Sequence, residues 1–207
     1  MLSNKSVVAQ KKITDGTITY DIIIETSGKD PQLTANASIT VYLKNNLVRT
    51  DMINSMGNES TIYDSKAGTA VILKEYSGQK LMITLTKENW EEKNRANSEL
   101  VFEKSTETKT VNGIVCKKAT AKLKNGKSLT VYYNEDVLPV NKDYNPLFRN
   151  LTGLAMEYEI EYGKSKYKYS VAKINYDAVL AANFEIPKSG YRVMTYEETK
   201  EIKKTGL

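Results

Sequence analysis

The chain has 207 residues, of which 40 % are hydrophobic and 27 % are charged, a composition typical of a folded, soluble protein. It contains no histidine and a single cysteine, so Ser-His-Asp, Cys-His and histidine-bound zinc chemistry are excluded. The net charge of +5 arises from lysines that are interleaved with acids, and without a dense basic run we expect no nucleic-acid partner.

The chain between residues 17 and 85 alternates apolar and polar residues in the manner of half-buried strands. Apolar residues recur at every second position within 17–25, and 38–44 repeats the pattern. Asn45-Asn46 follows, and because asparagine tolerates a positive φ, this pair predicts a tight hairpin. Further strands are predicted at 47–53, 61–64, 69–76 and 81–85. Such a succession, with turns about every 10 residues, predicts an antiparallel meander.

The alternation stops at 87–96, which predicts a short helix or helical loop. Asn125-Gly126 is the strongest short hairpin signal in the chain. The segment 137–151 carries two prolines and is predicted to be irregular, with a short helix near its end that holds Pro146 in the first turn. Strands are predicted around these features at 99–104, 108–111, 114–123 and 128–133.

The most clearly amphipathic element is a predicted hairpin formed by 154–162 and 166–171. Tyrosine and aliphatic side chains occupy one face of its first strand and glutamates the other, while its second strand alternates lysine and tyrosine. Pairing Glu161 with Lys166 satisfies both faces at once, so we predict a four-residue loop from Tyr162 to Ser165. Alternating carboxylates opposite lysines indicate a solvated face, and we expect no metal site there.

The last part of the chain carries short helical signals. A helical turn is predicted at 178–182, and 184–187 ends in a proline. Thr195, followed three residues later by Glu198, forms a capping box that predicts the start of a terminal helix.

These elements predict a mainly β (α+β) fold, with a single large curved antiparallel sheet that forms an open or half β-barrel and short helices on its concave face. We expect one domain over 16–207, preceded by a flexible N-terminal segment over 1–15. The strand-like surroundings of Cys116 predict a buried, structural cysteine.

The N-terminal segment also bears on localisation. Val7-Val8-Ala9 has the small-residue spacing of a signal-peptidase site, which favours export to the periplasm or the outer surface. A frayed terminus is the alternative interpretation. No stretch approaches the roughly 20 apolar residues of a membrane span, so we expect no transmembrane segment.

Three segments, 39–49, 60–64 and 184–191, resemble the front hairpin, the following hairpin and the closing strand of the lipoprotein-carrier (LolA/LolB-like) superfamily. The phrases at 111–119, 131–133 and 151–154 are similar in rhythm to uncharacterised secreted proteins of Bacteroidetes-type envelopes, which are grouped as a domain of unknown function. The resemblance implies an open barrel that binds lipids without catalysis, with a helical lid supplied here by 87–96 and 137–151.

The function predicted from these features is a non-catalytic envelope protein with an apolar groove for a lipid or another amphiphile. Arg49 is a candidate to close the cavity or to meet the ligand's head group, with an exposed strand arginine as the alternative. Each wall candidate has plain core packing as its alternative role, and we expect neither a cofactor nor a metal. The wall candidates are Tyr42, Met52, Met82, Trp90, Phe148 and Met156.

Two other function classes remain open from the sequence. A structural or protein-interaction scaffold of the cell envelope would have a filled core and an exposed apolar patch. An enzyme that uses carboxylates alone would need two acids about 5–10 Å apart in a cleft, and no pair is singled out among the many acids. We therefore expect a monomeric binding protein that is not an enzyme.

Overall fold

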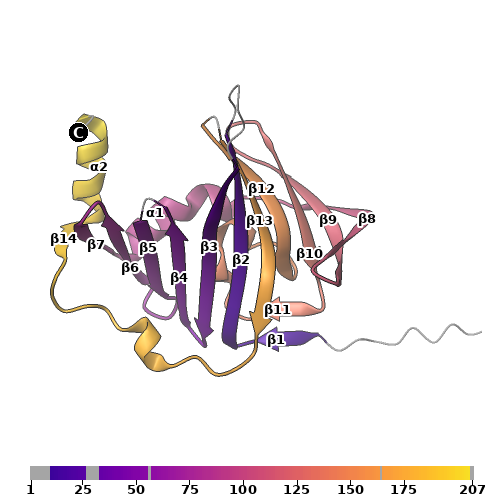
Figure 1. The fold of residues 1–207 in the computed structure, drawn as a ribbon, viewed down its shortest axis with the longest axis horizontal. Helices are drawn as coiled ribbons and strands as arrows, with labels where there is room; N and C mark the ends of the chain where they lie inside the picture. Colours follow the sequence, from indigo (N-terminus) through magenta and orange to yellow (C-terminus); the bar gives the residue numbers. More distant parts are fainter. Residues whose placement is uncertain (1–9, 27–32, 56, 164, 206–207) are drawn as a thin grey trace, which may run out of the picture.

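The computed structural model describes residues 10–26, 33–55, 57–163 and 165–205 (Figure 1). Residues 1–9 of the predicted N-terminal segment 1–15 lie outside the described part of the chain. Within the rest of that segment, β1 begins at Lys11 and β2 at Asp15. Twelve of the described strands form one sheet. They are β2 (Asp15–Thr26), β3 (Leu33–Lys44), β4 (Leu47–Asn54), β5 (Gly57–Asp64), β6 (Thr69–Tyr76), β7 (Gln79–Leu85), β8 (Glu103–Val111), β9 (Ile114–Lys122), β10 (Ser128–Asn134), β12 (Leu154–Tyr162), β13 (Ser165–Asn175) and β14 (Arg192–Thr195).

The remaining elements are short. Two strands, β1 (Lys11–Ile13) and β11 (Val137–Pro139), pair with each other in a separate sheet. The described helices are α1 (Lys87–Ser98) and α2 (Tyr196–Thr205), and the 3₁₀ turns are η1 (Lys142–Tyr144), η2 (Pro146–Phe148) and η3 (Ala181–Phe184). Neither α-helix in this described part of the chain is long and apolar enough to cross a membrane.

The large sheet has the first strand of the meander at its centre. From β2, the strands β3 to β7 follow one another in sequence on one side, and β13, β12, β10, β9 and β8 continue on the other (Figure 1). The central ladder between β2 and β13 pairs Ile18 with Ile174 and Ile22 with Tyr169. The two halves of the chain thus meet in one continuous sheet.

The strand arrangement corrects the prediction of a wholly antiparallel sheet. β14 runs parallel to β7, and β1 runs parallel to β11. The alternation of side chains identifies a strand but not its partner, so these parallel pairs had no sequence signal. The outermost strands, β14 and β8, lie at opposite ends of the strand order, and the described strands form no closed barrel.

The β3–β4 turn and the register of the last hairpin agree with the sequence predictions. Asn45 has a φ of +53° at the β3–β4 turn. Glu161 pairs with Lys166 in the ladder of β12 and β13, as predicted. The loop is tighter than the predicted four residues because Tyr162 and Ser165 already pair with each other, and Gly163 adopts the positive φ that such a turn requires.

Helix α1 begins where the sequence predicts a change of pattern. Thr86 caps it by accepting a hydrogen bond from the backbone N–H of Asn89, and the Asn89 side chain accepts one from the Thr86 backbone. At the other end of the chain, Thr195 and Glu198 form the predicted capping box of α2. Both helices are therefore fixed at their N-termini by local hydrogen bonds.

The two faces of the sheet are covered by different segments. We call the side covered by α1, η1 and η2 the helix face, and the side crossed by residues 176–191 the strap face, with those residues as the strap (Figure 1). The strap packs Val179 and Phe184 against Ile62, Leu73 and Met82 of the sheet.

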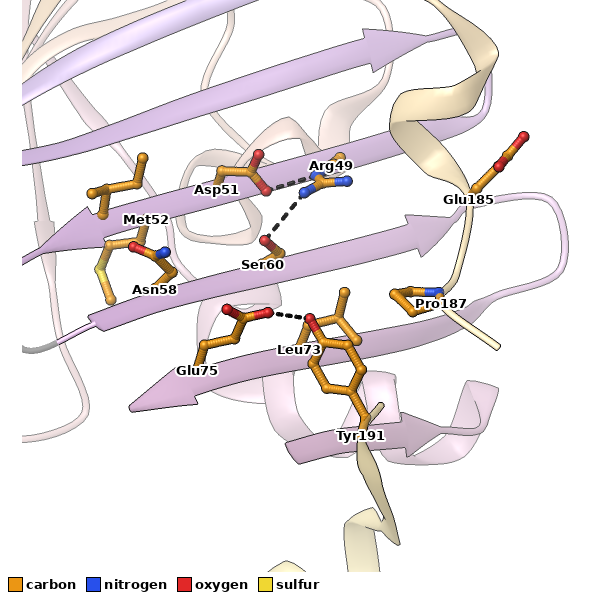
Figure 2. A pocket seen from close by; sticks show the side chains of 11 residues that line it. Arg49, Asp51, Met52, Asn58, Ser60, Leu73, Glu75, Glu185, Pro187 and Tyr191 are labelled. Carbon is orange, nitrogen blue, oxygen red and sulfur yellow. Dashed lines mark hydrogen bonds and ion pairs between the residues drawn. The ribbon is translucent and has the colours of Figure 1, made fainter. Parts of the chain in front are cut away.

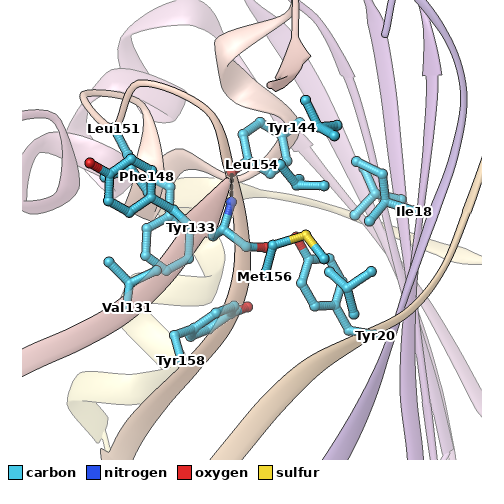
Figure 3. Close-up of a cluster of buried hydrophobic side chains, with 14 of the residues drawn as sticks. Ile18, Tyr20, Val131, Tyr133, Tyr144, Phe148, Leu151, Leu154, Met156 and Tyr158 are labelled. Atoms are coloured by element: carbon cyan, nitrogen blue, oxygen red, sulfur yellow. Dashed lines mark hydrogen bonds between the residues drawn. The ribbon is translucent and has the colours of Figure 1, made fainter. Parts of the chain in front are cut away.

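The main core lies on the helix face, between the sheet and the segment 137–151 (Figure 3). Its centre is aromatic, with the ring of Phe148 4.6 Å from that of Tyr158 and the ring of Tyr158 4.6 Å from that of Tyr169. A smaller cluster packs Trp90 of α1 against β5, β6 and β7. Cys116 is buried in the main core, as predicted, and burial raises its pKa to about 11, so it stays a thiol at neutral pH.

Candidate functional site

A pocket of about 270 Å³ opens on the helix face between the sheet, α1 and the η1–η2 segment. We call it the aromatic pocket, since its walls include the rings of Tyr20, Tyr63, Trp90, Tyr144 and Tyr158. Its size is just below the range of about 300–1,000 Å³ that is usual for small-molecule sites. Aromatic and aliphatic side chains predominate in its lining, which also includes the charged residues Glu59, Lys93 and Asp143.

The period-two alternation of the strands builds one wall of this pocket. Val41 faces Thr50 across the β3–β4 ladder, and Val48 faces Tyr63 across the β4–β5 ladder. All of these side chains point to the helix face because paired residues share a face of the sheet. Helix α1 then lays Trp90 on Tyr63, with ring centroids 4.3 Å apart and an interplanar angle of 16°.

The hydroxyls of Tyr20, Tyr144 and Tyr158 at the pocket have hydrogen-bond partners. The hydroxyl of Tyr20 donates to the carbonyl of Ala155 at 2.8 Å, and the hydroxyl of Tyr144 accepts from the Ala155 backbone N–H at 3.1 Å. Asn145 Nδ2 donates to the Tyr158 hydroxyl at 3.3 Å. With their polar tips engaged, these residues line the pocket with fixed apolar rings.

Two buried polar atoms at the pocket lack a hydrogen bond. They are Trp90 Nε1 and Asp143 Oδ1, and among the described residues they are the buried side-chain atoms without such a partner. Trp90 and Asp143 are each 6 % exposed, and both line the pocket. Because buried polar groups are nearly always hydrogen-bonded in native proteins, this pair marks the pocket as a place where a ligand could bind.

The charge of Asp143 is only partly compensated. Its side chain is buried, and Arg149 Nη1 lies 3.5 Å from Oδ1. Burial raises the pKa of Asp143, and the positive charge of Arg149 opposes that shift. Asn141 caps η1: its Oδ1 accepts a hydrogen bond from the Asp143 backbone N–H at 3.0 Å. This bond fixes the position of Asp143 at the pocket wall.

A larger depression of about 510 Å³ adjoins the aromatic pocket. We call it the basic depression, because it is lined by Lys66, Lys87, Arg95 and Arg149 together with one acid, Glu91. The two cavities share part of their walls. The shared residues are Tyr63, Trp90 and Asn94.

A third pocket, of about 260 Å³, lies on the strap face between β4, β5, β6 and the strap (Figure 2). Arg49 donates from Nε to Asp51 at 2.6 Å, from Nη1 to the carbonyl of Asn183 at 2.8 Å and from Nη2 to Ser60 at 3.4 Å. The Tyr191 hydroxyl donates to Glu75. These groups already bind one another, so they attach the strap to the sheet.

The structure distributes the seven residues predicted for the site over three places. Trp90 lines the aromatic pocket and the basic depression. Arg49 and Met52 line the pocket on the strap face.

The other four predicted residues pack within the protein. Met82 is buried beneath the strap, and Tyr42 packs against the same cluster. Phe148 and Met156 are each 0 % exposed in the main core.

Sequence reasoning missed several residues of the aromatic pocket. Tyr63 could have been predicted from the sequence, because the alternation of the two strands places it on the same face of the sheet as Val48. Asp143 and Tyr144 were not, since they belong to an irregular segment in which no period relates a residue to a face of the sheet.

The acidic row of β12 is neutralised by lysines. Glu157 lies 2.5 Å from Lys109, and Glu159 lies 2.5 Å from Lys166. Glu161 is likewise 2.5 Å from Lys127. These carboxylates form ion pairs with lysines of neighbouring strands, as expected for alternating charges, but Glu157 is buried rather than solvated because Lys109 and Lys168 lie against it.

No known family model matches the chain, and no curated protein matches it either. Among solved structures, PNGF-II in two crystal forms is similar to 90 % of this chain, with a TM-score of 0.52 and 13 % and 14 % sequence identity. The chain spans about a third of the length of PNGF-II, 32 % and 33 % in the two forms. At such identities the likeness is one of fold, and the fold is rich in β-structure.

Two further structures are less similar. An uncharacterised conserved protein from Thermus thermophilus has a TM-score of 0.47 and 10 % identity, over 86 % of this chain and 90 % of that protein. MucB has a TM-score of 0.36 and 8 % identity, over 87 % of this chain and 60 % of MucB.

Proposed function

We propose that this protein binds, without catalysis, a lipid or another small amphiphile whose apolar part enters the aromatic pocket. The observation that carries the proposal is a pocket of about 270 Å³ with fixed aromatic walls and two buried polar atoms that make no hydrogen bond. In small-molecule sites, aromatic rings usually provide the apolar contact area, and a few polar atoms fix the orientation of the ligand by hydrogen bonds.

The finer proposal is a carrier of the LolA/LolB-like type, with an open, curved sheet and a movable lid. It is supported by the way the two predicted lid segments lie together, since α1 packs against η2 and both border the aromatic pocket. Outward movement of α1 would take Trp90 off Tyr63 and widen the entrance. The periplasm or outer surface is the proposed location, although the supporting Val7–Ala9 motif lies outside the described residues.

A structural scaffold of the cell envelope is the second candidate. The observation that favours it is the density of the main core, in which Phe148, Leu154 and Met156 are each 0 % exposed. A scaffold would need no ligand, so the two candidates differ in whether the aromatic pocket takes up an apolar molecule.

Native mass spectrometry, with organic extraction of the purified protein, tests whether an amphiphile co-purifies. Titration with dodecanol then tests uptake directly, because Trp90 is the single tryptophan of the chain and lies in the pocket wall. We expect a change in tryptophan emission that saturates at one equivalent. A chain without bound amphiphile that also fails to take up dodecanol would favour the scaffold.

A pair of matched substitutions places the binding. Thr50→Phe fills the aromatic pocket from β4, whereas Thr40→Phe adds the same ring to the strap face of the neighbouring strand. We expect Thr50→Phe to weaken dodecanol binding by an order of magnitude or more and Thr40→Phe to leave it unchanged. Equal effects of the two substitutions would contradict binding in this pocket.

A further inference from the structure

The aromatic pocket and the basic depression differ in chemistry and have a common wall: rings and aliphatic side chains predominate in the first, beside Glu59, Lys93 and Asp143, and cations in the second. Tyr63 and Trp90 line both, with Asn94 beside them, so the two cavities adjoin at these side chains. An apolar site next to a charged one is the arrangement that a molecule with a tail and a charged head would need. The inference that follows rests on the proposed function, because it concerns the head group of the same ligand.

The charge of the basic depression is strongly one-sided. Lys66, Lys87, Arg95 and Arg149 line it, and Glu91 is the one acid among its lining residues. Arg149 is the member of this set with an ion-pair partner, Asp143. In the described part of the chain, the side chains of the other three cations make no hydrogen bond or ion pair with the protein.

The backbone helps to place one of these cations. An added Cβ at Gly68 would lie 2.8 Å from Cγ of Lys87, so the aliphatic stem of Lys87 runs across this glycine. Lys87 is also the first residue of α1, which Thr86 fixes by its capping box. The ammonium group is thus carried on a stem that is packed against the turn between β5 and β6.

The shared wall adds a neutral donor. The indole N–H of Trp90 is buried without a hydrogen-bond partner, and an indole can only donate. An oxyanion accepts hydrogen bonds from such a donor and from ammonium and guanidinium groups alike. A cationic head group would satisfy none of these donors.

We infer that the amphiphile held here has an anionic head group, carboxylate, sulfate or phosphate, which lies in the basic depression while its tail fills the aromatic pocket. Lysine and arginine side chains from the β5–β6 turn, α1 and the segment after η2 surround the head, and stacked Trp90 and Tyr63 separate it from the tail. The two cavities together have the volume of an ordinary small-molecule site.

Four dodecyl probes that differ only in the head group test the inference, namely dodecanoate, dodecyl phosphate, dodecanol and dodecyltrimethylammonium. Binding is measured by calorimetry and by Trp90 emission below the aggregation concentration of each probe. We expect the two anions to bind an order of magnitude more tightly than dodecanol, and the cation most weakly. Added salt should weaken the anions and leave dodecanol unchanged.

A double substitution locates the head group. Lys87→Gln with Arg95→Gln removes two cations of the depression, and we expect dodecanoate to bind no more tightly than dodecanol, whose affinity stays the same. The control is Lys12→Gln with Lys188→Gln, which changes the net charge equally at exposed positions that line neither cavity. We expect the control to retain the preference for anions.

The outcomes separate this inference from the proposed function. If no dodecyl probe binds, the proposed function fails and the inference fails with it. If dodecanol or the cation binds as tightly as the anions, or if the control substitutions weaken anion binding as much as the test pair, the inference is overturned while the proposed function stands.

Discussion

At the scale of single residues, Trp90 and Asp143 are unusual choices for a buried position. Each keeps a polar atom away from water without a hydrogen bond, which is unfavourable by about 1–3 kcal/mol per group. Both residues line the aromatic pocket, so the unfavourable free energy of burying these atoms arises at the proposed binding site. Such local destabilisation is a frequent property of functional sites.

This reasoning predicts that Asp143→Asn stabilises the protein at neutral pH. Burial raises the pKa of Asp143 above its usual value of 3.8, so ionisation opposes folding. The penalty is absent at low pH, where the carboxyl is protonated in both states, and it grows as the pH rises above about 4. Urea unfolding at several pH values should therefore show a variant that matches the wild type at pH 3 and exceeds it at pH 7.

The opposite result is informative too. Asparagine loses the ion pair with Arg149 Nη1, which lies 3.5 Å from the carboxylate. A variant that is less stable than the wild type at pH 7 would mean that this pair outweighs the burial of the charge.

At the scale of elements, the turn before β12 depends on a close approach of two backbones. Gly153 has a φ of +124°, and a Cβ placed there would lie 2.2 Å from the carbonyl oxygen of Asn134. No side chain fits without moving one of the strands. We expect Gly153→Ala to lower the free energy of unfolding by at least about 2 kcal/mol, measured by urea denaturation.

Gly113 provides the matched control. It also has a positive φ, but nothing lies within 4 Å of an added Cβ. Gly113→Ala should therefore lose only about 1 kcal/mol, from backbone strain alone. If both substitutions cost the same, the contact with Asn134 contributes nothing.

The strap is a second element, and side chains of the sheet hold its backbone. Arg49 holds it through the carbonyl of Asn183 at 2.8 Å, and Lys44 through the carbonyl of Val179 at 2.8 Å. Arg49→Met keeps the apolar stem but removes the donors. We expect a local loss of about 1–2 kcal/mol and faster hydrogen exchange of amides in η3, with the central sheet unaffected.

Lys74→Met is the control for that exchange measurement. Lys74 pairs with Glu59 at 2.7 Å, and Glu59 lines the aromatic pocket on the opposite face of the sheet from the strap. Unchanged exchange in η3 of the Arg49 variant would mean that Arg49 is not needed to hold the strap, and that Lys44, Tyr191 and the packing of Val179 and Phe184 suffice.

The elements that the sequence predicts well are those with two independent constraints. The β12–β13 register was predictable because lysine-glutamate pairs and apolar pairs both require it. The capping box of α2 was predictable because Thr195 and Glu198 act on each other locally. The parallel pairings of β1 and β14 were not, because short strands carry no information about partners far away in the chain.

At the scale of the whole molecule, the site is assembled from segments that are distant in sequence. The aromatic pocket takes Tyr20 from β2, Trp90 from α1 and Tyr158 from β12. Trp90 was the one predicted wall residue that the pocket contains, and it belongs to the helix that the sequence predicts at 87–96. The others follow from the strand order, which places β13 and β12 beside β2 and which periodicity does not specify.

The central position of β2 has a consequence for how the protein is made. The meander from β2 to β7 is complete once residue 85 has been synthesised, but the partner strand on the other side of β2 ends at Asn175. Because a chain is synthesised at roughly 5–20 residues per second, that edge of β2 stays unpaired for on the order of ten seconds before β13 is complete. During this interval the apolar run Ile22-Ile23-Ile24 borders an unpaired backbone, the kind of strand edge that pairs readily with another chain.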